Sequence, residues 1–254
     1  MYSTVPELGI ARCGRAAILG LLVLAAVHTA SAGSQASLPP YPQMAPGAQY
    51  LMANRAAEIA LARSAAPPAI SGAATVLVLS SNGYETAVNG TNGFTCLVER
   101  AWMSPFDSPD FWNPKLRGPV CYNPAATRSI LPITRYRTKL AQSGAPKDEM
   151  FDEISAAIAR KALPALEPGA RSYMMSKDGY LGDGVGHWHS HLMFYVPGTD
   201  LSSWGANLPG SPVVVDDGHR KIPEQQVIFM VPVTHWSDGS LAPAAGHEAE
   251  GGHK

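Results

Sequence analysis

The stretch GHWHSHLMFYVPG, residues 186–198, places His187, His189 and His191 at alternate positions. If the stretch is a β-strand, the three side chains lie on one face, with neighbours about 7 Å apart. Two neighbouring imidazoles can then bind one ion, whereas the outer two, about 13–14 Å apart, cannot share it comfortably. A zinc or other divalent transition-metal site would therefore always include His189. The simpler interpretation, which we prefer, is that the histidines form a polar, partly hydrated face of the strand.

A metal site here needs further ligands from elsewhere in the chain. His235, in the segment VTHWSDG, is the first candidate. Asp183 and Asp238 are candidates for an acid–base group or for a carboxylate that orients a ligating histidine. No glutamate follows the histidines at the spacing expected of a cupin, and the H-E-x-x-H motif is absent. The metal hypothesis therefore rests on a short pattern.

A second feature is a basic segment between Phe111 and Lys147, which contains seven lysine or arginine residues and no acid. Arg128, Arg135 and Arg137 are candidates for binding a carboxylate or phosphate, because the guanidinium group offers a planar fork of donors. The alternative, which we prefer, is a solvated helix face whose charges are compensated by acids from other segments.

The first 32 residues are typical of a secretory signal peptide. Arg12 and Arg15 precede an apolar run, residues 16–27, and Ala30-Ser31-Ala32 provides a cleavage pattern of small residues. The run is too short to span a bilayer, which needs roughly 20 residues. We therefore expect an exported protein, periplasmic or extracellular, with no transmembrane segment after cleavage. The near-neutral charge argues against a nucleic-acid binder.

The predicted mature chain retains two cysteines, Cys96 and Cys121, because Cys13 lies in the signal. An even pair in an oxidising compartment favours a disulfide. A redox role is less favoured, since no C-x-x-C motif is present.

The hydrophobic pattern predicts strands, then helices, then strands. A helix beginning near Pro46 is followed by an antiparallel meander over residues 74–102, with Asn-Gly turns at Asn82, Asn89 and Asn92. Helices are expected near 125–131, 133–142 and 147–162, and strands at 171–176, 187–196 and 226–234, with a weaker run at 213–215. This order predicts an α+β fold around a mostly antiparallel sheet. We expect a flexible linker over residues 33–46, one domain over 47–239 and a disordered tail over 240–254.

Motifs of the common nucleotide-binding enzymes and serine hydrolases are absent. Four segments, NGFTCLVER, GPVCYNPAA, YMMSKDGYLGD and GHWHSHLMFYVP, together resemble a recurrent family of uncharacterised secreted bacterial proteins. The resemblance extends from about Glu58 to Asp238. It implies export and a single domain, and it assigns no catalytic residue.

Two functions follow from these observations. The first is an exported, non-enzymatic domain that binds an unidentified small molecule or protein. The alternative is a metal-dependent, hydrolase-like enzyme with a strand-borne His-x-His site.

Overall fold

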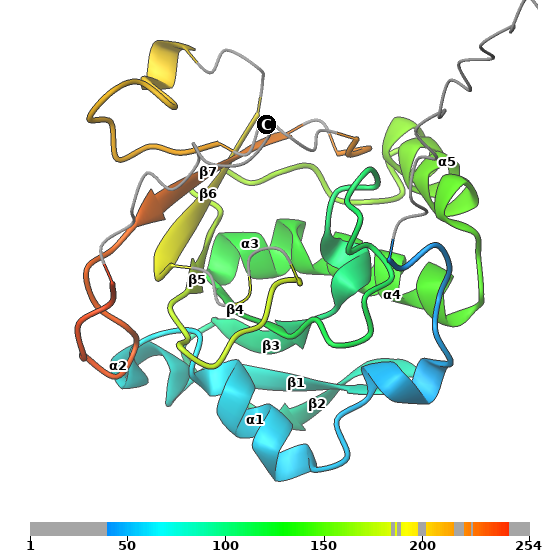
Figure 1. Ribbon diagram of the computed structural model, residues 1–254, viewed down its shortest axis with the longest axis horizontal. Coiled ribbons are helices and arrows are strands. Elements are labelled where there is room, and N and C mark those ends of the chain that lie inside the picture. Colours follow the sequence, from blue (N-terminus) through cyan, green and yellow to red (C-terminus); the bar gives the residue numbers. More distant parts are fainter. Residues whose placement is uncertain are drawn as a thin grey trace, which may run out of the picture. The chain divides into compact units, whose positions relative to one another are not determined.

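Seven strands form one sheet in the computed structural model of the protein (Figure 1). The chain divides into two units, Met1–Ser37 and Leu38–Lys254. The structure describes residues 40–183, 186, 189–197, 202–215, 221–224 and 226–243, all in the second unit. The predicted signal peptide lies outside these residues.

The strands are arranged in the order β2-β1-β3-β4-β5-β6-β7. All neighbouring pairs are antiparallel except β1 and β3, so the predicted α+β class with a mostly antiparallel sheet is confirmed. Their bounds are β1 Thr75–Ser80, β2 Gly83–Val88, β3 Thr95–Glu99, β4 Gly118–Tyr122, β5 Arg171–Met174, β6 His191–Pro197 and β7 Gln226–Pro232.

The predicted antiparallel meander is wrong at its third strand. β1 and β2 form the expected hairpin, in which Gly83 has φ 104° after the turn residue Asn82. The next strand, β3, pairs with β1 in parallel, through Thr75–Thr95 and Val76–Cys96. The Asn-Gly-rich segment before β3 is therefore a crossing loop and not a second hairpin turn. Gly90 lies in this loop, where an added Cβ would come within 2.1 Å of the Thr75 nitrogen.

The helices cover the two faces of the sheet. Their bounds are α1 Arg55–Arg63, α2 Pro68–Ser71, α3 Pro124–Ser129, α4 Leu131–Gln142 and α5 Lys147–Ala159, with short 3₁₀ helices η1 Gly47–Tyr50, η2 Ala101–Met103 and η3 Ser202–Trp204. The predicted helix from Pro46 is thus two elements, and α1 begins only after Asn54, whose side chain accepts a hydrogen bond from the Ala57 N–H at 3.1 Å.

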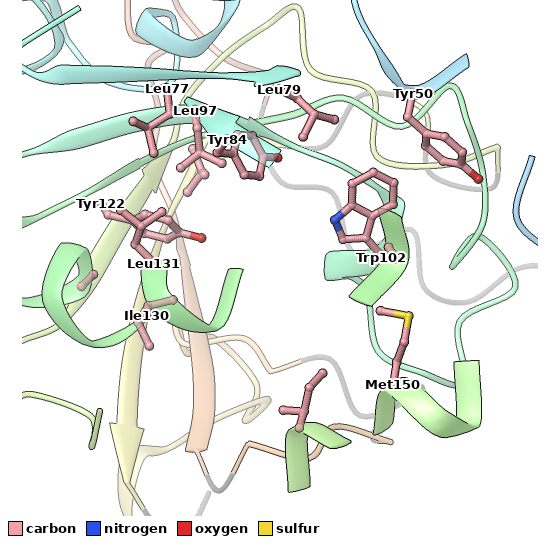
Figure 2. Close-up of a cluster of buried hydrophobic side chains, with 14 of the residues drawn as sticks. Tyr50, Leu77, Leu79, Tyr84, Leu97, Trp102, Tyr122, Ile130, Leu131 and Met150 are labelled. Atoms are coloured by element: carbon pink, nitrogen blue, oxygen red, sulfur yellow. The ribbon is translucent and has the colours of Figure 1, made fainter. Parts of the chain in front are cut away.

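Each face of the sheet has its own apolar core. On one face, α1 packs against β1, β3 and β4 over small residues such as Ala62 and Val98. On the other face, a larger cluster joins the sheet to α3, α4 and α5. Figure 2 shows this cluster, with Leu77, Leu79 and Leu97 on the strands, Leu131 and Met150 on the helices, and Ile130 between α3 and α4.

The histidine-rich stretch is a strand only in its second part. β6 begins at His191, so His189 precedes the strand and the expected alternation of three histidines on one strand does not hold. His187 lies outside the described residues. The weak run at 213–215 forms a single bridge, Val214 to Met230.

The described part of the predicted linker is packed, and the described part of the predicted tail forms backbone hydrogen bonds. Tyr41, Met44 and Ala45 contact the larger core cluster, although they fall in the predicted flexible linker. At the other end, Leu241 forms a bridge with His235, and the Ala242 N–H donates to the Thr234 carbonyl at 2.9 Å.

Cys96 and Cys121 form the expected disulfide. They are opposite each other in the register of β3 and β4, on the face covered by α1. The bond therefore joins two neighbouring central strands.

A buried ion pair joins four segments near the end of β3. Arg100, 0% exposed, lies 2.8 Å from Glu58 on α1. It also donates to the carbonyls of Tyr50 and Val98, while Glu58 accepts a hydrogen bond from the Leu79 N–H at 3.1 Å. The pair therefore connects η1, α1, β1 and β3 through hydrogen bonds.

Replacing both Cys96 and Cys121 by alanine is expected to lower the free energy of unfolding by about 2–5 kcal/mol, because the bond closes a loop across a separation of 25 residues. Urea denaturation of the variant and of the wild type, with and without reductant, measures the difference. A reductant that destabilises the variant as much as the wild type would contradict this assignment.

Glu58→Gln is expected to lower the free energy of unfolding by about 3–5 kcal/mol, because it leaves the Arg100 charge buried without a counter-ion. Glu85→Gln is the matched control, since the Arg55–Glu85 pair is exposed on both sides and such pairs contribute at most about 1 kcal/mol. Equal losses in denaturant unfolding for the two variants would show that Arg100 does not depend on Glu58.

Candidate functional site

A pocket of about 230 Å³ lies on the sheet face that carries α3 and α4. Five neighbouring strands, β3 to β7, contribute to its walls. Alternate residues of a strand share a face, and accordingly His191, Met193 and Tyr195 of β6 all line the pocket. We call it the Glu99 pocket.

Most of the lining is apolar. The apolar residues are Met103, Pro105, Leu116, Ile130, Ile133, Met174, Leu181, Met193, Ile222, Ile228 and Met230. Pockets that bind drug-sized molecules usually measure about 300–1,000 Å³ and combine apolar walls with a few polar groups. The volume and lining of the Glu99 pocket suit a smaller molecule of the same kind.

Glu99 and Tyr122 provide a polar centre in this apolar lining. They lie on neighbouring strands, and the Tyr122 hydroxyl donates to Oε1 of Glu99. Tyr122 is also 3.1 Å from the hydroxyl of Thr134 on α4. In the strand register Gly118 is opposite Glu99, so no side chain of that residue covers the carboxylate. Figure 2 shows the Tyr122 hydroxyl directed away from its strand.

The Glu99 carboxyl group has a raised pKa. Burial raises it from the ordinary value of 4.5 to about 7, while the hydrogen bond from Tyr122 and the charge of Arg137 oppose that rise. The residue is nevertheless partly exposed, because its surface faces the pocket. Near neutral pH this carboxyl group can therefore gain or lose a proton.

The two arginines that line the pocket are already paired. Arg137 contacts both carboxylate oxygens of Glu224, at 2.9 and 2.8 Å, and donates to the carbonyls of Trp102 and Ser104. Arg100 is paired with Glu58. The walls are therefore close to neutral apart from Glu99.

The described histidines do not assemble a metal site. The ring Nδ1 of His191 lies 2.7 Å from the His189 carbonyl, and burial lowers the pKa of the His191 imidazole. Both residues line a second pocket of about 10 Å³, which has room for about one water molecule. His235 is exposed, and its ring is 3.0 Å from the Thr234 hydroxyl. Among the residues that the structure describes, no three His, Cys, Asp or Glu side chains are grouped to hold a metal ion.

The candidate acid–base residues lie at two separate exposed clusters. Asp183 accepts hydrogen bonds from Tyr180 and Tyr41 and pairs with Lys115 at 3.2 Å, and these contacts hold its pKa well below the usual range. Asp238 pairs with Lys177 at 2.6 Å, which likewise lowers its pKa. Neither aspartate forms a hydrogen bond with a described histidine.

The three candidate anion-binding arginines have separate partners. Arg128 pairs with Glu167 at 2.7 Å, and Arg137 is buried against Glu224. Arg135 donates to the Tyr84 carbonyl at 2.8 Å. Acids from distant segments thus compensate Arg128 and Arg137, but Arg137 is buried and does not belong to a solvated helix face.

Sequence reasoning missed Glu99 and Tyr122 as site residues. Glu99 ends an otherwise apolar strand, and period-two alternation places it on the same face as the buried Leu97. A carboxylate on the inward face of a central strand was the available signal. Tyr122 gave no comparable signal, because its partner is fixed by strand pairing.

Comparisons of the chain with protein-family models, with curated proteins and with solved structures found no match. The expected membership of a secreted bacterial family therefore stays a prediction. Among the described residues, no helix is long and apolar enough to cross a membrane.

The raised pKa of Glu99 predicts that the protein loses stability as the pH rises. The folded protein holds the proton more tightly than the unfolded chain, so stability falls from about pH 4.5 to about pH 7 and is level above that range. The Glu99→Gln side chain does not ionise. By about pH 8 the free energy of unfolding of this variant should therefore exceed that of the wild type by up to about 3 kcal/mol.

Denaturant unfolding of both proteins across this pH range measures the effect. The matched control is Glu153→Gln, which removes a carboxylate from the exposed side of α5. Parallel pH profiles for Glu99→Gln and the wild type would contradict the raised pKa.

Proposed function

We propose that this protein is an exported α+β domain that binds a small, mainly apolar molecule in the Glu99 pocket. The observation that carries the proposal is a pocket of about 230 Å³ with apolar walls and one carboxyl–phenol pair. Binding sites for small molecules commonly have this composition, in which the walls supply affinity and the few polar groups fix orientation.

The disulfide supports the proposal of export. Disulfides persist in oxidising compartments and are rare in the cytosol. Cys96 and Cys121 are bonded, and the N-terminal sequence has the arrangement of a secretory signal. Export into the periplasm or beyond it agrees with both observations.

The four methionines of the lining support a ligand-binding role. Met103, Met174, Met193 and Met230 come from η2, β5, β6 and β7. Methionine is unbranched and polarisable, and it adapts to differently shaped partners. A pocket built this way can accommodate a small molecule with limited backbone movement.

Filling the pocket should remove binding. Met193→Phe and Met193→Trp place rings of increasing size in the pocket, so affinity for a small apolar probe such as benzyl alcohol should fall progressively, by about tenfold or more for tryptophan. Calorimetry measures the affinity, and circular dichroism checks the fold, since overpacking costs about 1–3 kcal/mol.

Leu208→Trp is the matched control, because Leu208 is 56% exposed and does not line the pocket. Binding that survives both Met193 substitutions, or that is equally reduced by Leu208→Trp, would place the probe elsewhere and contradict the proposal.

A further inference from the structure

We infer that the ligand of the Glu99 pocket is a small organic cation, an amine on an apolar body, whose ammonium group pairs with the Glu99 carboxylate. The inference rests on the proposed function, since it names the chemical class that the same pocket would select. It follows from the charges of the walls, the hydrogen bonds of Glu99 and the side chains around it.

The positive charges in the walls are already neutralised. Arg100 donates to Glu58 and to two carbonyl groups, and Arg137 donates to both oxygens of Glu224 and to two carbonyl groups. A ligand carboxylate or phosphate would have to compete with these buried partners. The pocket therefore offers little to an anion.

The negative charge of Glu99 is not neutralised in this way. Its contact among the described residues is the neutral Tyr122 hydroxyl at Oε1, and no described cation lies within ion-pair distance. Oε2 of Glu99 accepts no hydrogen bond from a described residue. It is also not one of the fully buried polar atoms without a partner in the described residues, so part of its surface is accessible. This oxygen therefore faces the pocket and is available to a donor.

The walls around Glu99 also favour a cation over a neutral donor. Tyr122, Tyr195 and four methionines are among the lining residues. Aromatic rings attract ammonium groups, and methionine sulfur is polarisable. An ion pair formed away from bulk water is stronger than one at the surface, provided both charges are satisfied. An amine with an apolar body places its ammonium group on the Glu99 carboxylate and its apolar part against the lining side chains.

Binding of an amine should be coupled to proton release. An ammonium group favours the ionised carboxylate, and near neutral pH part of Glu99 is protonated, since its pKa is about 7. The other groups facing Glu99 are Tyr122, Tyr195, Tyr84 and Arg137. Burial raises the pKa of all three tyrosines above the ordinary value of 10, so they stay neutral in this pH range. Below about pH 7, affinity for an amine should fall about tenfold for each pH unit.

His191 and Glu224 line the more distant walls of the pocket. Burial lowers the pKa of His191, so its protonation at lower pH would weaken amine binding in the same direction. The Glu99→Gln variant separates the two groups, because it abolishes the contribution of Glu99 and leaves His191 in place.

Three probes of matched shape test the inference, namely benzylamine, benzyl alcohol and benzoate. Calorimetry at about pH 5.5 and about pH 8.5, on either side of the pKa of Glu99, gives six affinities for each protein. We expect benzylamine to bind at least about tenfold more tightly than benzyl alcohol at the higher pH, and benzoate to bind most weakly. Benzyl alcohol should show little dependence on pH.

Glu99→Gln should reduce benzylamine affinity to that of benzyl alcohol, while benzyl alcohol still binds, which shows that the pocket is intact. Glu153→Gln should change neither affinity. The inference is overturned if benzylamine binds no more tightly than benzyl alcohol, if benzoate binds best, or if Glu99→Gln leaves benzylamine affinity unchanged.

These outcomes are distinct from failure of the proposed function. Benzyl alcohol binding that Met193→Trp abolishes, without any advantage for benzylamine, would retain the pocket as a binding site and reject the cation. If none of the three probes binds the wild type at either pH, the proposed function is rejected together with the inference.

Discussion

The ion pair between Arg100 and Glu58 is the interaction on which both the fold and the pocket depend. An arginine that is 0% exposed would be very costly without a counter-ion, and Glu58 on α1 supplies that counter-ion. The carboxylate also accepts the Leu79 N–H of β1, so the helix, the strand and the arginine are fixed together. Arg100 follows Glu99 directly, and its neutralisation leaves the neighbouring carboxylate as the uncompensated charge of the pocket.

Local patterns predicted the elements of the fold better than their connections. Asn82-Gly83 marked the β1–β2 hairpin, and the apolar stripe of Ile154 and Ile158 marked α5. The parallel pairing of β3 with β1 was missed, because an Asn-Gly dipeptide indicates a turn and does not indicate which strand the chain joins next. Strand order is decided by burial on both faces of the sheet, which no short segment reveals.

The Glu99 pocket was not predicted, because residue type and spacing drew attention to other polar residues. His189, Asp183 and Asp238 attracted attention as clustered polar residues, whereas Glu99 is a single acid at the end of an apolar strand. Burial raises the pKa of Glu99, and its hydrogen-bond donor, Tyr122, comes from another strand. The disulfide was predictable because compartment and cysteine count are enough to suggest it, without knowledge of geometry.

The order of strands in the sheet has a consequence for how the pocket is assembled. β3 lies beside β1, and each later strand, from β4 to β7, lies beside the one before it. A chain that emerges from its N-terminus can therefore extend the sheet at one growing edge. Residues of β3 to β7 line the Glu99 pocket, so its walls are complete only when β6 and β7 have joined the sheet.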